Sequence, residues 1–246
     1  KLKLVAIAPE VEGAKEAIDY FLSQGVTMAA YHTNATYQQA NRGIDRGITV
    51  ATHLGNGMTG LQHRDVGTMG ACLLRDEVDC ELICDGHHVC IPMLDIILRL
   101  KSHDKIIMVS DNVQYAGAPA GEYLREKQTE HSDRNVIFVT QEGLVISKSG
   151  RLSGSSKPVL YGMKNLVENL HMPLEEVIRL SSYNPCRKYG FLERKGSIRE
   201  KKDADFVVIT DDFQVVQTYC QGRKVYDQTT DRNLFNTRFL EKYKRG

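Results

Sequence analysis

Residues 50–58 read VATHLGNGM, a short apolar run that ends in His53 and passes into a glycine-rich turn. Two other stretches end in the same way: residues 28–36 read MAAYHTNAT, and residues 106–112 read IIMVSDN. They place His32 and Asp111 after runs that have the length and composition of buried parallel strands. The repetition predicts three strands that each deliver a metal-binding or proton-binding side chain at the carboxyl end.

Strands alternate with helices over the first 111 residues. The apolar pattern predicts strands at 2–8, 26–32, 48–54, 80–85 and 105–111, and helices at 14–23, 36–46, 67–75 and 92–101. Such alternation is typical of a parallel sheet that is covered on both faces. In open α/β sheets and in α/β barrels, the chemistry lies at the carboxyl ends of the strands. His32, His53, His88 and Asp111 all fall there.

The alternation of predicted strands and helices becomes less regular after residue 111. The apolar pattern predicts a loop at 114–133, a β-ribbon at 135–148, helices at 157–170 and 173–183, strands at 205–210, 215–220 and 223–226, and a basic surface helix at 234–244. Pro185 is expected to end the second of these helices. The predicted domains are residues 1–195 for the α/β part, 196–230 for part of a small β unit, and 231–246 for a C-terminal tail.

Composition excludes several classes of protein. The chain has 246 residues and a hydrophobic content of 41%, which is enough for one large α/β domain or two small ones. Its net charge of +1 argues against a nucleic-acid surface, and no apolar run reaches the roughly 18 residues of a membrane span. The first apolar run is too short for a secretory signal. Six cysteines without a CxxC pair predict reduced thiols in a cytoplasmic protein.

Two histidines on adjacent strand ends suit a divalent transition metal such as zinc or iron. A carboxylate on a later strand could then accept a proton from metal-bound water. A single histidine at a strand end is more often a packed or hydrogen-bonded side chain. Three histidines and an aspartate at equivalent positions favour a functional site over coincidence.

Three other features each have two interpretations. Cys84, His87, His88 and Cys90 could form a zinc cluster, but their spacing fits no standard finger, and alternation along 80–84 favours core packing. Arg64 is either a solvated charge or a phosphate clamp. Residues 152–156, LSGSS, are either a turn that caps a helix or a loop that lines a pocket.

Several motifs together resemble a known family. They are APE at 8–10, HTNAT at 32–36, THL at 52–54, DGHHV at 85–89, VSD at 109–111, LSGSS at 152–156, NP at 184–185 and KDAD at 202–205. As a set, they resemble the N-acetylglucosamine-6-phosphate deacetylases of the amidohydrolase superfamily, over about residues 5–226. The resemblance implies metal-dependent hydrolysis of N-acetylglucosamine 6-phosphate to glucosamine 6-phosphate and acetate, in amino-sugar catabolism.

The resemblance also implies roles for individual residues. His32 and His53 are the expected metal ligands, and Asp111 is the expected general acid and base. The implied cofactor is one or two divalent ions per subunit, with zinc, iron, manganese and cobalt all possible. The implied substrate-binding residues are Asn56, Gly57, Arg64, His88, Leu152, Ser153, Gly154 and Ser155. Arg64 resembles an arginine that reaches the phosphate in a neighbouring subunit, so a homodimer is expected.

Five positions depart from the family pattern. The family usually has glycine where this chain has Tyr31, an aromatic or similar residue at Gly55, alanine at Gly57, an apolar residue at His87 and alanine at Asn112. These departures concern the detail of substrate binding more than the class of reaction.

The family fold is a (β/α)₈ barrel with a small β-sandwich built from both chain ends. Five strand–helix units are predicted here, and Asp111 matches the last strand of that barrel, so the expected fold is a partial barrel, strands 4–8, with a small C-terminal β unit. The family's glutamate ligand and a carbonyl-polarising histidine then lie outside this chain, and Glu10 takes no ligand role. We expect an N-terminally truncated chain or one half of a split protein. The alternatives are another amidohydrolase, such as a deaminase or a dihydroorotase-like enzyme, and a non-catalytic sugar-phosphate-binding remnant.

Overall fold

A computed structural model describes residues 2–125, 135–231 and 241–244. The first part of the chain alternates strands with helices, as the sequence predicts. The elements are β1 (Leu4–Ile7), α1 (Ala14–Ser23), β2 (Thr27–Ala30), α2 (Tyr37–Asp45), β3 (Ile48–Ala51), α3 (Gly67–Leu74), β4 (Asp79–Ile83), α4 (Ile91–Leu100) and β5 (Ile106–Val109). The α/β class is therefore confirmed, and each predicted element is matched within a few residues.

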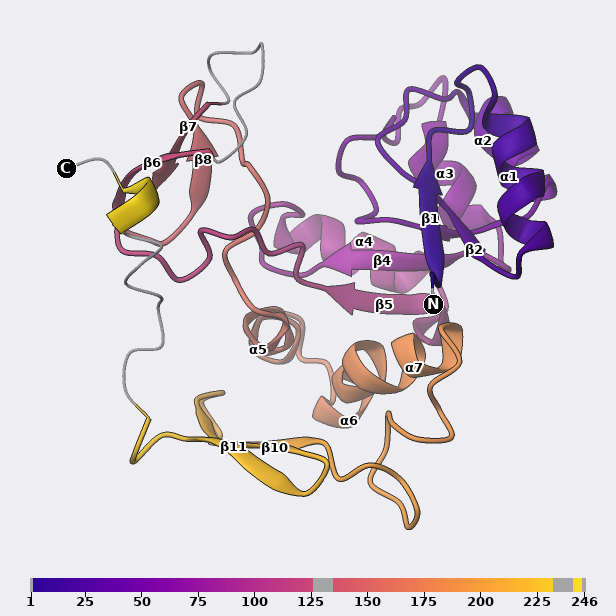
Figure 1. Cartoon of the computed structure of the whole chain (residues 1–246). Coiled ribbons are helices and arrows are strands. Elements are labelled where there is room, and N and C mark those ends of the chain that lie inside the picture. The colour runs from indigo at the N-terminus through magenta and orange to yellow at the C-terminus, as the bar shows by residue number, and fades with distance from the viewer. Residues whose placement is uncertain (1, 126–134, 232–240, 245–246) are drawn as a thin grey trace.

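These five strands form one parallel sheet in the order β1-β2-β3-β4-β5. The sheet is strongly twisted: β1 runs upward in Figure 1, while β4 and β5 run to the left. Among the residues that the structure describes, neither β1 nor β5 pairs with a further strand on its outer side. Since the order follows the chain, successive strand ends lie next to one another along one rim.

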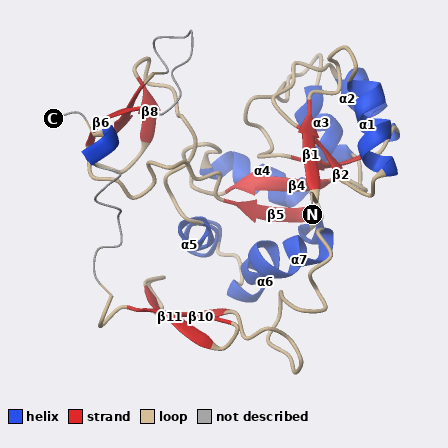
Figure 2. Cartoon of the chain, viewed as in Figure 1, coloured by secondary structure: helices blue, strands red, loops and turns tan. Residues whose placement is uncertain are grey.

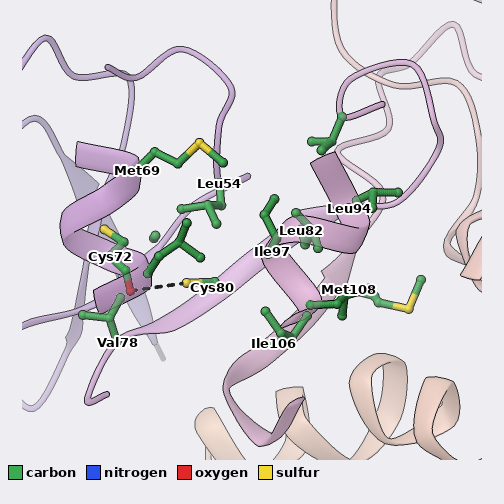
Figure 3. Packing of buried hydrophobic residues seen from close by; sticks show 14 of the residues in the cluster. Leu54, Met69, Cys72, Val78, Cys80, Leu82, Leu94, Ile97, Ile106 and Met108 are labelled. Atoms are coloured by element: carbon green, nitrogen blue, oxygen red, sulfur yellow. Dashed lines mark hydrogen bonds between the residues drawn. The ribbon is translucent and has the colours of Figure 1, made fainter. Parts of the chain in front are cut away.

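The largest apolar cluster lies between the sheet and the helices α3 and α4 (Figure 3). Leu82 and Ile97 are fully buried there, and the thiol of Cys80 points at the carbonyl of Cys72, 3.8 Å away. Burial raises the pKa of the Cys72 and Cys80 thiols to about 12, so both stay protonated. These thiols serve packing.

The zinc-cluster interpretation of residues 84–90 is wrong for the described structure. Cys84 belongs to the same apolar cluster and is 2% exposed, whereas Cys90 faces solvent. Burial raises the pKa of the Cys84 thiol, which disfavours the thiolate that a metal needs. Within the described ranges, no three His, Cys, Asp or Glu side chains are placed to hold a metal ion.

The loop predicted at 114–133 contains a strand, so that prediction was wrong in part. β6 (Gly121–Leu124) pairs with β7 (Val136–Val139), which pairs with β8 (Val145–Ser147), in an antiparallel sheet at the upper left of Figure 1. Tyr123 is fully buried, and its hydroxyl donates to the carbonyl of Pro119 at 2.6 Å. The β-ribbon predicted at 135–148 is confirmed.

Helices α5 (Val159–Leu170), α6 (Leu174–Ile178) and α7 (Asn184–Lys188) pack below β5 in Figure 1, with a π-helical turn at Arg179–Tyr183 between the last two. The prediction that Pro185 ends a helix was wrong. Pro185 lies in the first turn of α7, which directly follows the π-helical turn, so the helical run continues past it.

The predicted C-terminal β unit is confirmed as three antiparallel strands, β9 (Phe206–Ile209), β10 (Val215–Cys220) and β11 (Arg223–Asp227) (Figure 2). The helix predicted at 234–244 falls mostly outside the described residues, and the domain boundaries at 195 and 230 stay predictions. No described helix combines the length and apolar character that a membrane crossing requires.

Candidate active site

Three side chains that the sequence singled out share an unusual backbone. His32 follows β2, His53 follows β3 and Asp111 follows β5, and their φ angles are 37°, 35° and 52°. Residues other than glycine rarely adopt this left-handed region, and each such residue costs roughly 1–3 kcal/mol. Strain of this kind concentrates at functional sites, where it turns a side chain out of the strand direction.

The two histidines lie side by side. Their ring centroids are 5.0 Å apart, with the planes tilted by 41°. Burial and the neighbouring His53 lower the pKa of His32, and the charge of Asp111 opposes that effect in part. The ring of His32 is therefore neutral near pH 7, which is the form that binds a metal ion. The structure brings His32, His53 and Asp111 to one rim of the sheet.

The residues present fit part of a metal site. His53 is 5% exposed, and its Nδ1 atom has no hydrogen-bond partner among the described residues. Buried ring nitrogens normally have partners, so this atom suits a ligand that the protein itself does not provide. Two imidazoles fit two ligand positions of a divalent metal ion. The described part of the chain adds no third His, Cys, Asp or Glu to them.

The turn after His53 is shaped around the His32 ring. The backbone and side-chain amides of Asn56 donate to the carbonyl of His53 at 3.0 and 3.3 Å. A Cβ atom on Gly57 would lie 2.6 Å from Cδ2 of His32, so the glycine lets the backbone approach the ring. Phosphate binding by Asn56 and Gly57 stays a prediction.

Two residues near the histidines make contacts that the sequence did not predict. Tyr31 stacks on the His32 ring, with centroids 3.9 Å apart and planes 7° apart. The carboxylate of Glu10 accepts the Thr33 hydroxyl at 2.5 Å and the Asn34 N–H at 2.7 Å, and so ties the loop after β1 to the loop after β2. The sequence had drawn attention to Tyr31 as a departure from the family pattern and to Glu10 in the APE motif, but it predicted neither contact.

His88 is held by an aspartate. Its Nδ1 atom lies 2.8 Å from Oδ2 of Asp85, and the side chains are 9% and 4% exposed. Burial alone would raise the pKa of Asp85, but hydrogen bonds from His88 and His87 outweigh it and lower that pKa. Asp85 is therefore ionised at neutral pH. The sequence singled out His88 but gave Asp85 no role.

The loop at 152–155 lies beside Asp111. The N–H of Ser155 donates to the carbonyl of Asp111 at 2.9 Å, and the carbonyl of Ser155 accepts the N–H of Val113 at 3.0 Å. Ser155 is 1% exposed, whereas Leu152 is exposed. The hydroxyl of Ser153 accepts a hydrogen bond from Arg125, a cation that sequence reasoning had left in a loop. Substrate contacts from Leu152, Ser153, Gly154 and Ser155 stay predictions.

Arg64 extends from the long loop between β3 and α3. It is exposed and forms no ion pair within the described residues. Its neighbour Asp65 accepts the N–H of Gly67 at 2.8 Å and that of Tyr37 at 3.3 Å, which anchors the loop. The structure does not bring Arg64 into contact with His32 or His53, and its phosphate role stays a prediction.

Comparison with curated proteins points to sugar-phosphate deacetylases. The chain is 34% identical over 231 residues to N-acetylglucosamine-6-phosphate deacetylase from Vibrio furnissii, covering 94% of this chain and 55% of that protein. It is 35% identical over 224 residues to N-acetylgalactosamine-6-phosphate deacetylase from Escherichia coli O157:H7, covering 90% and 56%. The chain spans about half the length of the curated relatives that it matches.

Comparison with solved structures points to the same group of enzymes. The crystal structure of N-acetylglucosamine-6-phosphate deacetylase from Thermotoga maritima superimposes with a TM-score of 0.80 at 30% identity, covering 92% of this chain and 60% of that one. A mutant of the Mycobacterium smegmatis enzyme in complex with N-acetyl-D-glucosamine-6-phosphate gives 0.82 at 28% identity, covering 91% and 57%. Residues 10–225 match the family described as Amidohydrolase family. This chain belongs to the amidohydrolase family.

Proposed function

We propose that this chain carries part of a metal-dependent amide hydrolase that converts N-acetylglucosamine 6-phosphate to glucosamine 6-phosphate and acetate. The observation that carries the proposal is the convergence of His32, His53 and Asp111 on one rim, each with a left-handed backbone. The curated relatives and the substrate complex of the Mycobacterium smegmatis enzyme support the choice of substrate.

The proposed fold is strands 4–8 of a (β/α)₈ barrel with the small β unit at the C-terminus. Three features support it: the strand order follows the chain, each crossover carries a helix, and the sheet is strongly twisted (Figure 1). The chain covers 55% of the Vibrio furnissii protein and 60% of the Thermotoga maritima chain, as expected for part of a barrel. The missing third ligand would then belong to the remaining strands.

His32 and His53 are the proposed ligands of one or two divalent ions, with zinc, iron, manganese and cobalt as candidates. When bound, such an ion polarises the amide carbonyl and lowers the pKa of a water molecule. Asp111 is exposed at the end of β5, and its carboxylate is proposed to accept the proton of the attacking water. The same carboxyl group then donates that proton to the departing amine nitrogen.

The phosphate and the sugar are assigned to different groups. Arg64, Asn56 and the backbone at Gly57 are proposed to bind the phosphate, since guanidinium and N–H groups recognise this anion. His88 is proposed to contact the sugar. A phosphate bound through Arg64 of a second subunit implies a homodimer, and we propose a cytoplasmic location for it.

The first experiment measures bound metal and acetate release together. The full product of the gene that contains this sequence is purified, its metal content is determined by elemental analysis, and acetate release from N-acetylglucosamine 6-phosphate is assayed beside Asp111→Asn. We expect one or two ions per chain and a loss of turnover in the variant of about 10²–10⁴-fold. Metal without turnover indicates another amidohydrolase, and neither metal nor turnover indicates a non-catalytic remnant.

A second experiment tests the phosphate assignment. Arg64→Ala removes one charged hydrogen-bond donor, so KM for N-acetylglucosamine 6-phosphate should rise about 10- to 100-fold. Activity toward unphosphorylated N-acetylglucosamine should stay the same, because that substrate has no anion for Arg64 to bind. A KM that does not change for the phosphorylated sugar would exclude Arg64 as a phosphate ligand.

A further inference from the structure

One buried carboxylate controls the position of His88. Oδ1 of Asp85 accepts the backbone N–H groups of His87 at 2.9 Å and of His88 at 2.8 Å. Its other oxygen, Oδ2, faces Nδ1 of His88 at 2.8 Å. The aspartate therefore shapes the turn after β4 with one oxygen and holds the imidazole with the other.

The same contacts dictate which ring nitrogen carries the proton. The hydrogen bonds lower the pKa of Asp85 in spite of its burial, so the group is ionised and can only accept. A contact of 2.8 Å between an ionised carboxylate and Nδ1 requires a proton on Nδ1. In the neutral ring, Nε2 is then an acceptor, and it is the nitrogen left for a ligand.

The carboxylate also connects His88 to the backbone of Asp111. The hydroxyl of Ser155 lies 3.4 Å from Oδ2 of Asp85, and the N–H of Ser155 donates to the carbonyl of Asp111 at 2.9 Å. Ser155 is 1% exposed, so water does not compete for these contacts. Ser155 thus contacts both the carboxylate that holds His88 and the backbone of the proposed general base.

We propose that Asp85 is a positioning residue that fixes His88 as the Nδ1–H tautomer and so presents Nε2 as an acceptor to a sugar hydroxyl group. An acceptor nitrogen binds a hydroxyl, which can donate, and discriminates against a phosphate oxygen, which can only accept. The choice of ligand group rests on the proposed function. The tautomer itself rests on the contacts of Asp85 alone.

Asp85→Asn isolates this effect. The amide keeps an oxygen for the two backbone N–H groups and replaces the other oxygen with an NH₂ donor of nearly the same size. Nδ1 of His88 must then accept, and the proton must move to Nε2. In a serine protease, the same change from aspartate to asparagine beside the catalytic histidine leaves the geometry intact and produces the wrong tautomer of that histidine.

The test is ¹⁵N NMR of the histidine side chains in the full chain, recorded at about pH 8, where the neutral ring of an ordinary histidine prevails. His88→Ala identifies the signals. We expect the proton on Nδ1 in the wild type and on Nε2 in Asp85→Asn. A wild-type His88 with its proton on Nε2, or with both nitrogens protonated, would overturn the proposal. The wild-type spectrum alone shows which nitrogen of His88 carries the proton. The proposal can therefore still be refuted if Asp85→Asn does not fold.

Kinetics supply the second readout. Asp85→Asn should lower kcat/KM for N-acetylglucosamine 6-phosphate about 10- to 100-fold, the size of effect known for partners that orient metal-binding histidines. In His88→Ala, the further change Asp85→Asn should have little additional effect, since both act through one ring. If the double variant lost as much kcat/KM as the two single variants combined, Asp85 would not act through His88, and the positioning role would be contradicted.

Two controls separate the explanations. Asp95→Asn removes an exposed carboxylate that pairs with Arg99 at 2.9 Å, and it should change neither the spectrum nor the kinetics. Ser155→Ala leaves the contact between Asp85 and His88 in place, so the wild-type tautomer should persist; a switched tautomer would overturn the proposal. If the wild-type tautomer is as expected but no preparation releases acetate, the proposed function fails and the inference about His88 stands.

Discussion

Gly57 is restricted to glycine both by its backbone conformation and by a neighbouring side chain. Its φ is 59°, and an added Cβ would lie 2.6 Å from Cδ2 and 3.0 Å from Nε2 of His32. Tyr31 stacks on the same ring, so the imidazole has a neighbour on its face as well. A side chain at position 57 therefore costs left-handed strain and also displaces a proposed metal ligand.

We expect Gly57→Ala to lower the free energy of unfolding by about 2 kcal/mol. For a chain of this size, that is roughly 4–8 °C in Tm by thermal unfolding. Gly60→Ala is the matched control, because Gly60 lies in the same loop with nothing within 4 Å of its added Cβ. Equal losses in the two variants would show that the contact with His32 is not the cause.

Glu81 is a carboxyl group on β4 that the proposed chemistry does not use. Burial raises its pKa, and the hydroxyl of Tyr189, which donates to Oε1 at 2.7 Å, opposes that effect in part. Because the folded state holds this proton more tightly than the unfolded state does, stability falls as pH rises. The contribution is complete below the unfolded pKa of about 4.3 and is lost as pH rises through the folded value.

Glu81→Gln removes this titration and keeps an oxygen for Tyr189. We expect the variant to match the wild type in Tm near pH 4, within the range where both chains are folded, and to exceed it at about pH 8. Thermal unfolding at intervals between these values measures the difference. A difference that stays the same from pH 4 to pH 8 would mean that Glu81 is ionised without penalty in the folded chain.

At the scale of elements, α7 is attached to the sheet by two ion pairs to one buried carboxylate. Asp79 on β4 is 2% exposed and lies 2.6 Å from Arg187 and 2.8 Å from Lys188. Lys188 also donates to the carbonyl of Thr49 on β3 at 2.8 Å. These contacts hold α7 at the N-terminal ends of β3 and β4.

Asp79→Asn leaves the charge of Lys188 nearly buried without its partner. We expect the free energy of unfolding to fall by about 3–5 kcal/mol, as measured by urea denaturation. Asp19→Asn is the control, since Asp19 forms an exposed pair with Arg46 at 2.7 Å and should leave stability unchanged within error. A small effect at Asp79 would show that α7 is held mainly by its apolar contacts.

The elements that the sequence predicted well are those with local signals. α1 has the bounds expected from its apolar spacing, and Gly25 follows its end. β6 has no such signal, because Gly121 and Glu122 interrupt its apolar pattern; pairing with β7 makes it a strand. Pro185 begins a helical turn after a π-helical segment, a combination that local propensity does not predict.

At the scale of the whole molecule, the parallel sheet has two open edges. β1 and β5 end the sheet as far as the structure describes it, and unpaired strand edges promote association. We expect sedimentation velocity of this chain alone to show a mass that rises with concentration beyond that of a dimer. A single monomeric or dimeric species over the whole concentration range would contradict this expectation.

The periodicity of apolar residues and the residue types at strand ends sufficed to predict the α/β class, most of the elements, and the meeting of His32, His53 and Asp111 at one rim. These are consequences of neighbouring residues in the chain and of the rule that parallel strands end together. The tertiary structure alone decided the left-handed backbone at these three residues, the burial of His53 and the contact of Ser155 with Asp85. Asp85 and Ser155 lie 70 positions apart, and contacts over such separations leave no local pattern in the sequence.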